Sequence, residues 1–121
     1  MLTALPAMFY HPDYSALALP PQHRYPISKY QTLYQQLLQL GVPQTAFTQS
    51  IPVSQAELAR VHCPDYIQSL AEGTIDAKAM RRIGFPWSNQ LFQRSLISVG
   101  GTVQTAHAAL STGIALHLSG G

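Results

Sequence analysis

The first half of the chain alternates short apolar runs with turn-forming residues. Residues 7–10 are an apolar run that stops at His11-Pro12-Asp13, which predicts a buried first strand and a turn. After a proline-rich segment, Ser28 begins a helix, with Gln31 completing a capping box and Gly41 ending the helical spacing of apolar side chains. Residues 45–48 then predict a second short strand.

Two short helices and one long helix are predicted next. Ser54 and Glu57 form a second capping box, and Pro64 begins a helix that Gly73 closes. After a polar and basic stretch, Ser88 caps the longest helix. Its large apolar positions fall on one stripe, made of Phe92, Leu96, Val99, Val103, Ala106 and Leu110.

A glycine pair lies inside the long helix. Each glycine costs about 1 kcal/mol relative to alanine in a helix, so Gly100-Gly101 predicts either close backbone packing or a local break. Gly113 ends the helix, and residues 114–118 predict a final buried strand. The order strand, helices, strand, long helix, strand is typical of a parallel α/β sheet. We expect one domain over residues 1–121, without a linker or an internal repeat.

The composition indicates a segment that is mostly interior to a larger structure. Charged residues are 10% of the 121 residues, whereas soluble domains average about a quarter, so the charges are too few to coat a small globule. No apolar run approaches the ~20 residues of a membrane span. The N-terminus lacks the basic region of a secretory signal. We therefore expect a cytoplasmic chain that does not enter a membrane.

Charge and cysteine content exclude two further classes. The net charge of +2 comes from seven scattered Lys and Arg residues, and nucleic-acid binding needs a dense basic face, so nucleic acid is excluded as a partner. The single cysteine, Cys63, excludes an internal disulfide. We expect Cys63 to be a small buried apolar residue, since a nucleophilic role needs an adjacent base.

The sequence holds no complete catalytic or metal-binding set. Ligands of open parallel sheets bind just past the carboxyl ends of the strands, and here the last predicted strand runs into Ser119-Gly120-Gly121. We expect His62-Cys63 to pack at a helix junction. His117, opposite in direction to Leu116 and Leu118, is expected to be a hydrogen-bonded structural histidine. The histidines lack the i, i+4 pairing of a zinc helix; they are His11, His23, His62, His107 and His117.

Several segments together carry a family resemblance. They read FYHPDY at 9–14, HRYPISKY at 23–30, VHCPDYI at 61–67, GFPWSNQLFQRS at 84–95, GGTV at 100–103 and GIALHLSGG at 113–121. In this order they resemble the histone deacetylase superfamily, and specifically its bacterial members similar to class IV enzymes, acetoin utilisation proteins and acetylpolyamine amidohydrolases. The resemblance covers nearly the whole chain.

The resemblance implies a fold and a reaction. The fold is the arginase/deacetylase type, a parallel sheet flanked by helices, of which this chain would be the N-terminal portion. The reaction is hydrolysis of the amide of an acetyl-lysine or acetyl-amine, in which zinc polarises the carbonyl and lowers the pKa of a bound water while a histidine acts as base. The family's zinc ligands and His-His pair follow the final Gly-Gly, so we expect no catalytic residue and no metal ligand here, and no activity from this chain alone.

The resemblance also implies substrate-side residues. Lys29 matches a basic position near an internal channel under the active site, and Tyr10 lies near that channel. Phe85 and Pro86 match a loop at the rim of the site, although the acidic rim residue of many relatives is absent. Gly120 and Gly121 match the turn at its lip.

A second hypothesis comes from another class of protein. A truncated parallel sheet leaves a strand edge unpaired, which invites association. The chain would then be a non-catalytic interaction module that dimerises or binds a partner through this edge. The partners expected under the two hypotheses are an acetylated lysine or small amine, a complementing C-terminal part, or a second copy of the chain.

Overall fold

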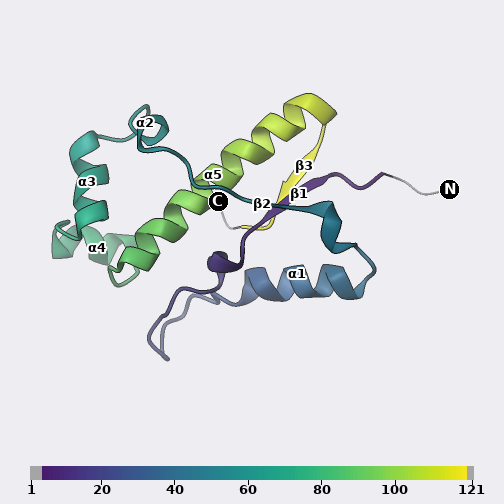
Figure 1. The fold of residues 1–121 in the computed structure, drawn as a ribbon. Coiled ribbons are helices and arrows are strands. Elements are labelled where there is room, and N and C mark those ends of the chain that lie inside the picture. The colour runs from purple at the N-terminus through teal and green to yellow at the C-terminus, as the bar shows by residue number, and fades with distance from the viewer. Residues whose placement is uncertain (1–3, 120–121) are drawn as a thin grey trace.

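A three-stranded parallel sheet forms the centre of the molecule (Figure 1). The computed structural model describes residues 4–119. Strand β1 (Ala7–Tyr10) lies between β2 (Phe47–Gln49) and β3 (Ala115–His117), in the order β2-β1-β3. Helix α1 (Lys29–Gln39) lies on one side of the strands and α5 (Asn89–Thr112) on the other. The predicted class, α/β with a parallel sheet flanked by helices, is confirmed.

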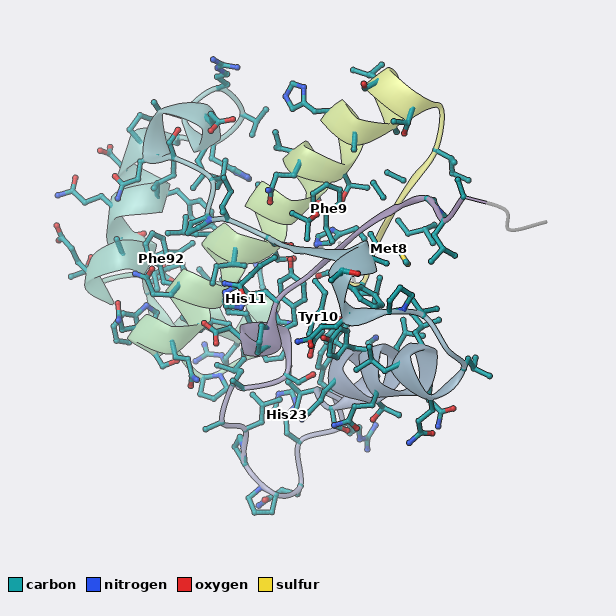
Figure 2. The ribbon with its side chains drawn as sticks, turned by 45° about the vertical axis from the view of Figure 1, so that its right-hand side comes forward. Met8, Phe9, Tyr10, His11, His23 and Phe92 are labelled. Atoms are coloured by element: carbon teal, nitrogen blue, oxygen red, sulfur yellow. The ribbon has the colours of Figure 1, made fainter. Side chains whose placement is uncertain are left out.

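Strand β1 is covered on both faces. Met8, Phe9 and Tyr10 are 3%, 7% and 6% exposed, and Figure 2 shows them along the strand between the two helices. The Tyr10 ring stacks on Tyr34 of α1, with 4.2 Å between the ring centroids. A strand buried on both faces needs a continuous apolar run rather than an alternating one, which is why this strand was predicted with its observed bounds.

Three short helices lie together beside the N-terminal half of α5 (Figure 1). They are α2 (Gln55–Leu58), α3 (Pro64–Glu72) and α4 (Ala77–Ile83). The capping box at Ser54 is present, and α3 begins at Pro64 and ends at a left-handed Gly73, both as predicted. Helix α4 was missed because its sequence is short and basic; Asp76 caps it by accepting a hydrogen bond from the amide of Ala79 at 2.7 Å.

The start of α1 differs from the prediction. Ser28 has helical backbone angles (φ −73°, ψ −10°) and makes no side-chain capping bond in the described structure, because a capping side chain requires an extended backbone at that residue. The amide of Gln31 instead donates to the Ser15 hydroxyl at 3.0 Å. The predicted capping box at Ser28 is therefore wrong, and the cap comes from a distant residue.

The second strand is shifted from its predicted position. Thr45 belongs to a 3-10 turn (Gln44–Ala46), and β2 begins only at Phe47. A second 3-10 turn, η1 (Pro12–Tyr14), follows β1 where a turn was expected. His11 caps η1 by accepting a hydrogen bond from the amide of Asp13 at 3.0 Å.

Helix α5 buries only part of the predicted stripe. Phe92 is 8% exposed, whereas Val99 and Leu110, also in that stripe, are 40% and 86% exposed. The contact face includes both glycines; its buried residues are Leu91, Phe92, Ile97, Gly100 and Gly101. The contact face was misassigned because a search for apolar periodicity looks for large side chains at the contact and does not count glycine.

Gly100 brings the backbone of α5 against the segment after β2. A Cβ atom at Gly100 would overlap the carbonyl oxygen of Ile51 and lie 2.7 Å from the amide nitrogen of Val53. The Val53 amide donates to the carbonyl of Leu96 at 2.9 Å. The helix runs unbroken through this point, so of the two predicted roles of the glycine pair, close backbone packing is the correct one.

Two predicted buried features are exposed. Ile114 and Leu116 are 61% and 44% exposed, and within residues 4–119 no strand pairs with the outer edge of β3. The expectation of a buried last strand is therefore wrong. Cys63 is also exposed, at the N-cap of α3, and not in the core. No helix in the described part of the chain is long and apolar enough to cross a membrane.

We predict that Gly100→Ala destabilises the protein. Helix propensity alone would give a gain of about 1 kcal/mol, but overpacking against backbone that cannot rotate away costs about 1–3 kcal/mol or more. We expect the free energy of unfolding, measured by urea denaturation, to fall by about 1–2 kcal/mol. Ser111→Ala, at an exposed position of the same helix, should change it by no more than about 0.5 kcal/mol. A stabilised Gly100→Ala variant would contradict the close approach.

Candidate functional site

The carboxyl ends of the three strands meet at one edge of the sheet. Because all three strands are parallel, Ser50 follows β2, His11 follows β1 and Ser119 lies just beyond β3. Ser50 is 2% exposed, and Tyr14, from the turn after β1, is fully buried. Open parallel sheets bind ligands at this edge, so polar side chains buried here are the candidates for a site.

Tyr14 and His117 form a partly buried hydrogen-bonded pair across this edge. The Tyr14 hydroxyl lies 2.7 Å from Nε2 of His117, and Thr102 Oγ1 lies 3.3 Å from Nδ1. The Thr102 hydroxyl also donates to the carbonyl of Ser98 at 3.2 Å, and the Tyr14 hydroxyl to the carbonyl of Ile97 at 3.4 Å. Each hydroxyl thus has a backbone acceptor as well as a ring nitrogen of His117 within reach, and both tautomers of the imidazole fit these contacts. The expected hydrogen-bonded structural histidine is confirmed.

Burial keeps this pair neutral. It lowers the pKa of His117 below its ordinary value of 6.5. It also raises the pKa of Tyr14, and the nearby Ser50 hydroxyl and the positive charge of Arg94 only partly oppose that shift. At neutral pH the pair therefore joins an un-ionised phenol to an unprotonated imidazole. This arrangement orients the end of β3 rather than generating a nucleophile.

The missing side chain of Gly101 makes room for the pair. A Cβ atom there would overlap Nε2 of His117 and lie 2.6 Å from the Tyr14 hydroxyl and 2.7 Å from Oγ of Ser50. We call Tyr14, Ser50 and His117 around Gly101 the Gly101 cluster. The Ser50 hydroxyl has no hydrogen-bond partner among the described residues. It is the one buried polar atom of the cluster with bonding capacity left over.

A second cluster combines aromatic rings with a cation. The Lys29 ammonium lies 5.0 Å and 5.2 Å from the ring centroids of Tyr25 and Tyr30, whose hydroxyls are hydrogen-bonded to each other. Tyr25 meets Phe85 edge to face, with 5.1 Å between centroids. His23 stacks on the other side of Phe85 at 5.3 Å and hydrogen-bonds the carbonyl of Gly84 at 2.8 Å.

Arg94 connects the two clusters. Its Nε donates to the carbonyl of Tyr14 at 2.9 Å, and its guanidinium carbon lies 5.6 Å from the ring centroid of Tyr30. Tyr30 also meets Tyr14 edge to face at 6.1 Å. A continuous set of contacts therefore runs from the sheet edge to the loop between α4 and α5.

The structure brings only some of the predicted substrate-side residues together. The structure brings Lys29 and Phe85 together through Tyr25, whereas Tyr10 is a core residue that reaches Tyr14 edge to face at 6.1 Å. Pro86 is exposed in the loop before α5. Gly120 and Gly121 lie outside the described residues.

Sequence reasoning missed four residues of the site: Tyr14, Ser50, Arg94 and Thr102. Ser50 had a weak signal, as a polar residue directly after a predicted strand. Tyr14 and Arg94 fell within segments that carried the family resemblance, yet nothing local indicated their contacts. Their partners lie 80 or more residues away in the chain.

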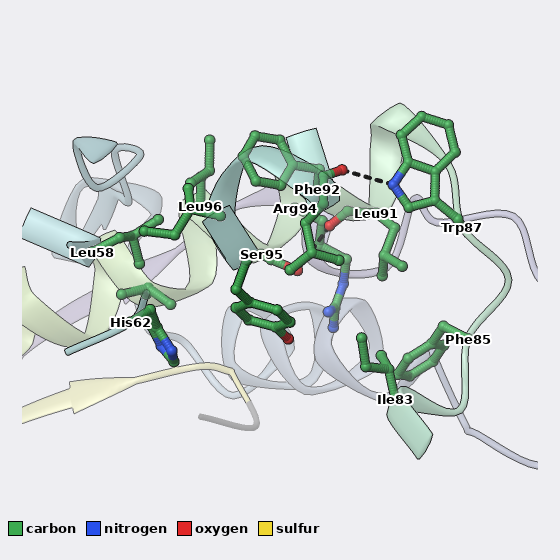
Figure 3. A pocket seen from close by; sticks show the side chains of 14 residues that line it. Leu58, His62, Ile83, Phe85, Trp87, Leu91, Phe92, Arg94, Ser95 and Leu96 are labelled. Atoms are coloured by element: carbon green, nitrogen blue, oxygen red, sulfur yellow. Dashed lines mark hydrogen bonds between the residues drawn. The ribbon is translucent and has the colours of Figure 1, made fainter. Parts of the chain in front are cut away.

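A pocket of about 270 Å³ opens between the short helices and α5 (Figure 3). Its walls are apolar, with Ile67 and Leu70 from α3 and Leu91 and Phe92 from α5. Trp87 closes one end, held by a hydrogen bond from its indole to the carbonyl of Leu70 at 2.7 Å. Arg94 also lines this pocket. The pocket is therefore next to the contacts that Arg94 makes with Tyr14 and Tyr30.

The described residues do not fit a zinc ion. Within residues 4–119, no three side chains of His, Cys, Asp or Glu are gathered closely enough to hold a metal. His117, the last residue of β3, has both ring nitrogens engaged. We therefore assign no metal-dependent step to these residues.

Comparison with known proteins gives two findings. Residues 23–121 match the family model of the histone deacetylase domain. The chain is also 44% identical, over 114 residues, to a protein of Picosynechococcus sp. described as uncharacterised. That alignment covers 93% of this chain and 37% of the relative, so the chain spans a little over one third of the length of this relative.

We predict that His117 makes stability depend on pH. In the unfolded chain His117 binds a proton near its ordinary pKa of 6.5, whereas in the folded chain it does so only at lower pH. The unfolded state thus takes up more protons, and the free energy of unfolding should fall as pH decreases through 6.5 towards the folded pKa. Urea denaturation at a series of pH values between 7.5 and 5 measures this loss.

His117→Asn should have a smaller pH dependence than the unmodified chain. His107→Gln, at an exposed position of α5, is the matched control and should keep the full dependence. Equal slopes for the unmodified chain and His117→Asn would show that the buried imidazole does not resist protonation.

Proposed function

The chain belongs to the histone deacetylase family, and we propose that it forms the N-terminal part of a zinc-dependent deacetylase that hydrolyses the amide of an acetylated lysine or small amine. The observation that carries this proposal is the extent of the family match. It runs from residue 23 to residue 121 and so includes β2, α5 and β3. These elements supply most of the carboxyl edge of the sheet, where parallel α/β folds bind their ligands.

We propose further that residues 1–121 are one incomplete domain and are inactive alone. The proposal is supported by the relative, of which the chain matches 37%. The zinc ligands and the catalytic base would then belong to a part of the enzyme that corresponds to the rest of that relative. The exposed thiol of Cys63 fits a reducing compartment such as the cytoplasm.

The role we propose for this chain is to shape the site. The Gly101 cluster fixes the end of β3 against α5, and a hydrogen bond of 2.9 Å between the Ser98 and Ser119 hydroxyls adds a second contact there. Tyr10, Lys29, Phe85 and Pro86 would lie on the substrate side of this edge, together with Gly120 and Gly121. A site assembled in this way binds and orients substrate, while the bond-breaking groups come from the complementing part.

A chimera tests the proposal. Residues 1–121 are joined to the part of the Picosynechococcus relative that continues past the aligned region, and the product is assayed with acetyl-lysine and acetylpolyamine probes. We expect hydrolysis of one probe class by the zinc-loaded chimera and none by residues 1–121 alone. A folded chimera that hydrolyses neither probe would overturn the proposed activity. Hydrolysis by the isolated chain would overturn the proposal that the catalytic groups belong to the complementing part.

Within the chimera, we predict that Lys29→Met lowers kcat/KM at least about tenfold. Lys29 is placed over two hydrogen-bonded phenols next to Phe85, and losing a cation at a substrate-side position costs about 1.5–3 kcal/mol if it bonds a charged or developing negative group. Lys78→Met, on the exposed face of α4, is the matched control and should leave kcat/KM unchanged. If the two substitutions changed kcat/KM equally, Lys29 would not be a residue of the substrate-binding site.

The exposed edge of β3 supports a second candidate, an interaction module. Ile114 and Leu116 are exposed beside an edge that no described strand pairs with, and such edges associate readily. In this case the isolated chain would dimerise, and Leu116→Lys would return it to a monomer. Sedimentation of the unmodified chain as a stable, folded monomer would rule the module out.

A further inference from the structure

The pocket between the short helices and α5 has the composition of a ligand site. Four aromatic side chains line it: Tyr66 from α3, Phe85 and Trp87 from the loop before α5, and Phe92 from α5. Figure 3 labels the last three of them. Its volume of about 270 Å³ is just below the range of about 300–1,000 Å³ that is usual for small-molecule pockets. A single ring with a short chain fits this volume, and a drug-sized molecule does not.

One strong charge faces this apolar space. Arg94 lines the pocket and carries five N–H donors, of which Nε is used in the hydrogen bond to the Tyr14 carbonyl. The lining residues, all within the described part of the chain, include no Asp or Glu. The only other lining side chain that can carry a charge is His62, so the pocket complements an anion and repels a cation.

The position of Arg94 favours a planar anion. Its guanidinium is held in place by the hydrogen bond from Nε to the carbonyl of Tyr14 and by the Tyr30 ring, whose centroid lies 5.6 Å from the guanidinium carbon. A guanidinium fixed in this way presents its remaining donors as a fork, which matches the two oxygens of a carboxylate. The aromatic walls in turn favour a ring, because they offer edges and faces on several sides.

We propose that this pocket binds a small aromatic carboxylate, with its ring among the aromatic walls and its carboxylate on Arg94. The site needs neither zinc nor a complementing part, although it shares Phe85 with the substrate-side residues of the proposed function. It meets the Gly101 cluster through Arg94, which holds the turn containing Tyr14. Ligand binding in the pocket would therefore change the contacts of Tyr14 in the Gly101 cluster.

Trp87 provides a direct measurement. It is the only tryptophan in the chain and lines the pocket, so its fluorescence reports occupancy. We would titrate the 121-residue chain with 3-phenylpropionate, its neutral amide and the corresponding amine. We expect the carboxylate to bind at least about tenfold more tightly than the amide, since only the carboxylate makes charge-assisted hydrogen bonds to Arg94. The amine should not bind measurably.

Two variants separate the charge from the cavity. Arg94→Gln should remove the preference for the carboxylate over the amide. Val99→Phe fills the pocket from α5 while keeping the Arg94 charge and should weaken both ligands at least about tenfold, whereas Leu110→Phe, also exposed on α5 but remote from the pocket, should not. If Arg94→Gln does not fold by circular dichroism, the Val99→Phe and ligand-charge comparisons still decide the matter. Equal binding of carboxylate and amide, no binding at all, or unchanged binding to Val99→Phe would each overturn the proposal.

Discussion

The close approach of α5 to the sheet determines the rest of the structure. At Gly100 the helix touches the backbone of the segment after β2 without an intervening side chain, and the Val53 amide reaches the Leu96 carbonyl. One residue further along, Gly101 makes space for Tyr14, Ser50 and His117. Two consecutive glycines have a low helix propensity. A larger side chain at either position, however, would push the helix off the strands. Both the packing of the sheet and its polar edge follow from that single contact.

Features encoded by neighbouring residues could be predicted from the sequence. The capping box at Ser54, the start of α3 at Pro64, its end at Gly73 and the cap of α5 at Ser88 all appear in the structure. In each case the side chain and the backbone group that it satisfies lie within about four residues. Strand β1 could be predicted equally well, because burial on both faces requires an uninterrupted apolar run in the sequence.

Features that depend on distant partners could not be predicted. The cap of α1 comes from Ser15, a residue 16 positions before the amide it satisfies. Tyr14 and His117 are 103 residues apart, and either one alone looks like an ordinary core residue. The contact face of α5 was misassigned for the same reason. A helix face that meets backbone directly is marked by the absence of side chains, and a search for apolar periodicity passes over it.

Arg94 shows how a single residue can link a site to its surroundings in this fold. Arg94 lines the pocket, its Nε donates to the carbonyl of Tyr14, and its guanidinium lies over Tyr30. A ligand bound to the remaining donors of the guanidinium would act on these contacts, and Tyr14 is the residue whose hydroxyl contacts His117. Coupling between two sites requires an element that both of them bias. The turn of Tyr14 meets that requirement, since the pocket acts on its carbonyl and the strand end acts on its hydroxyl.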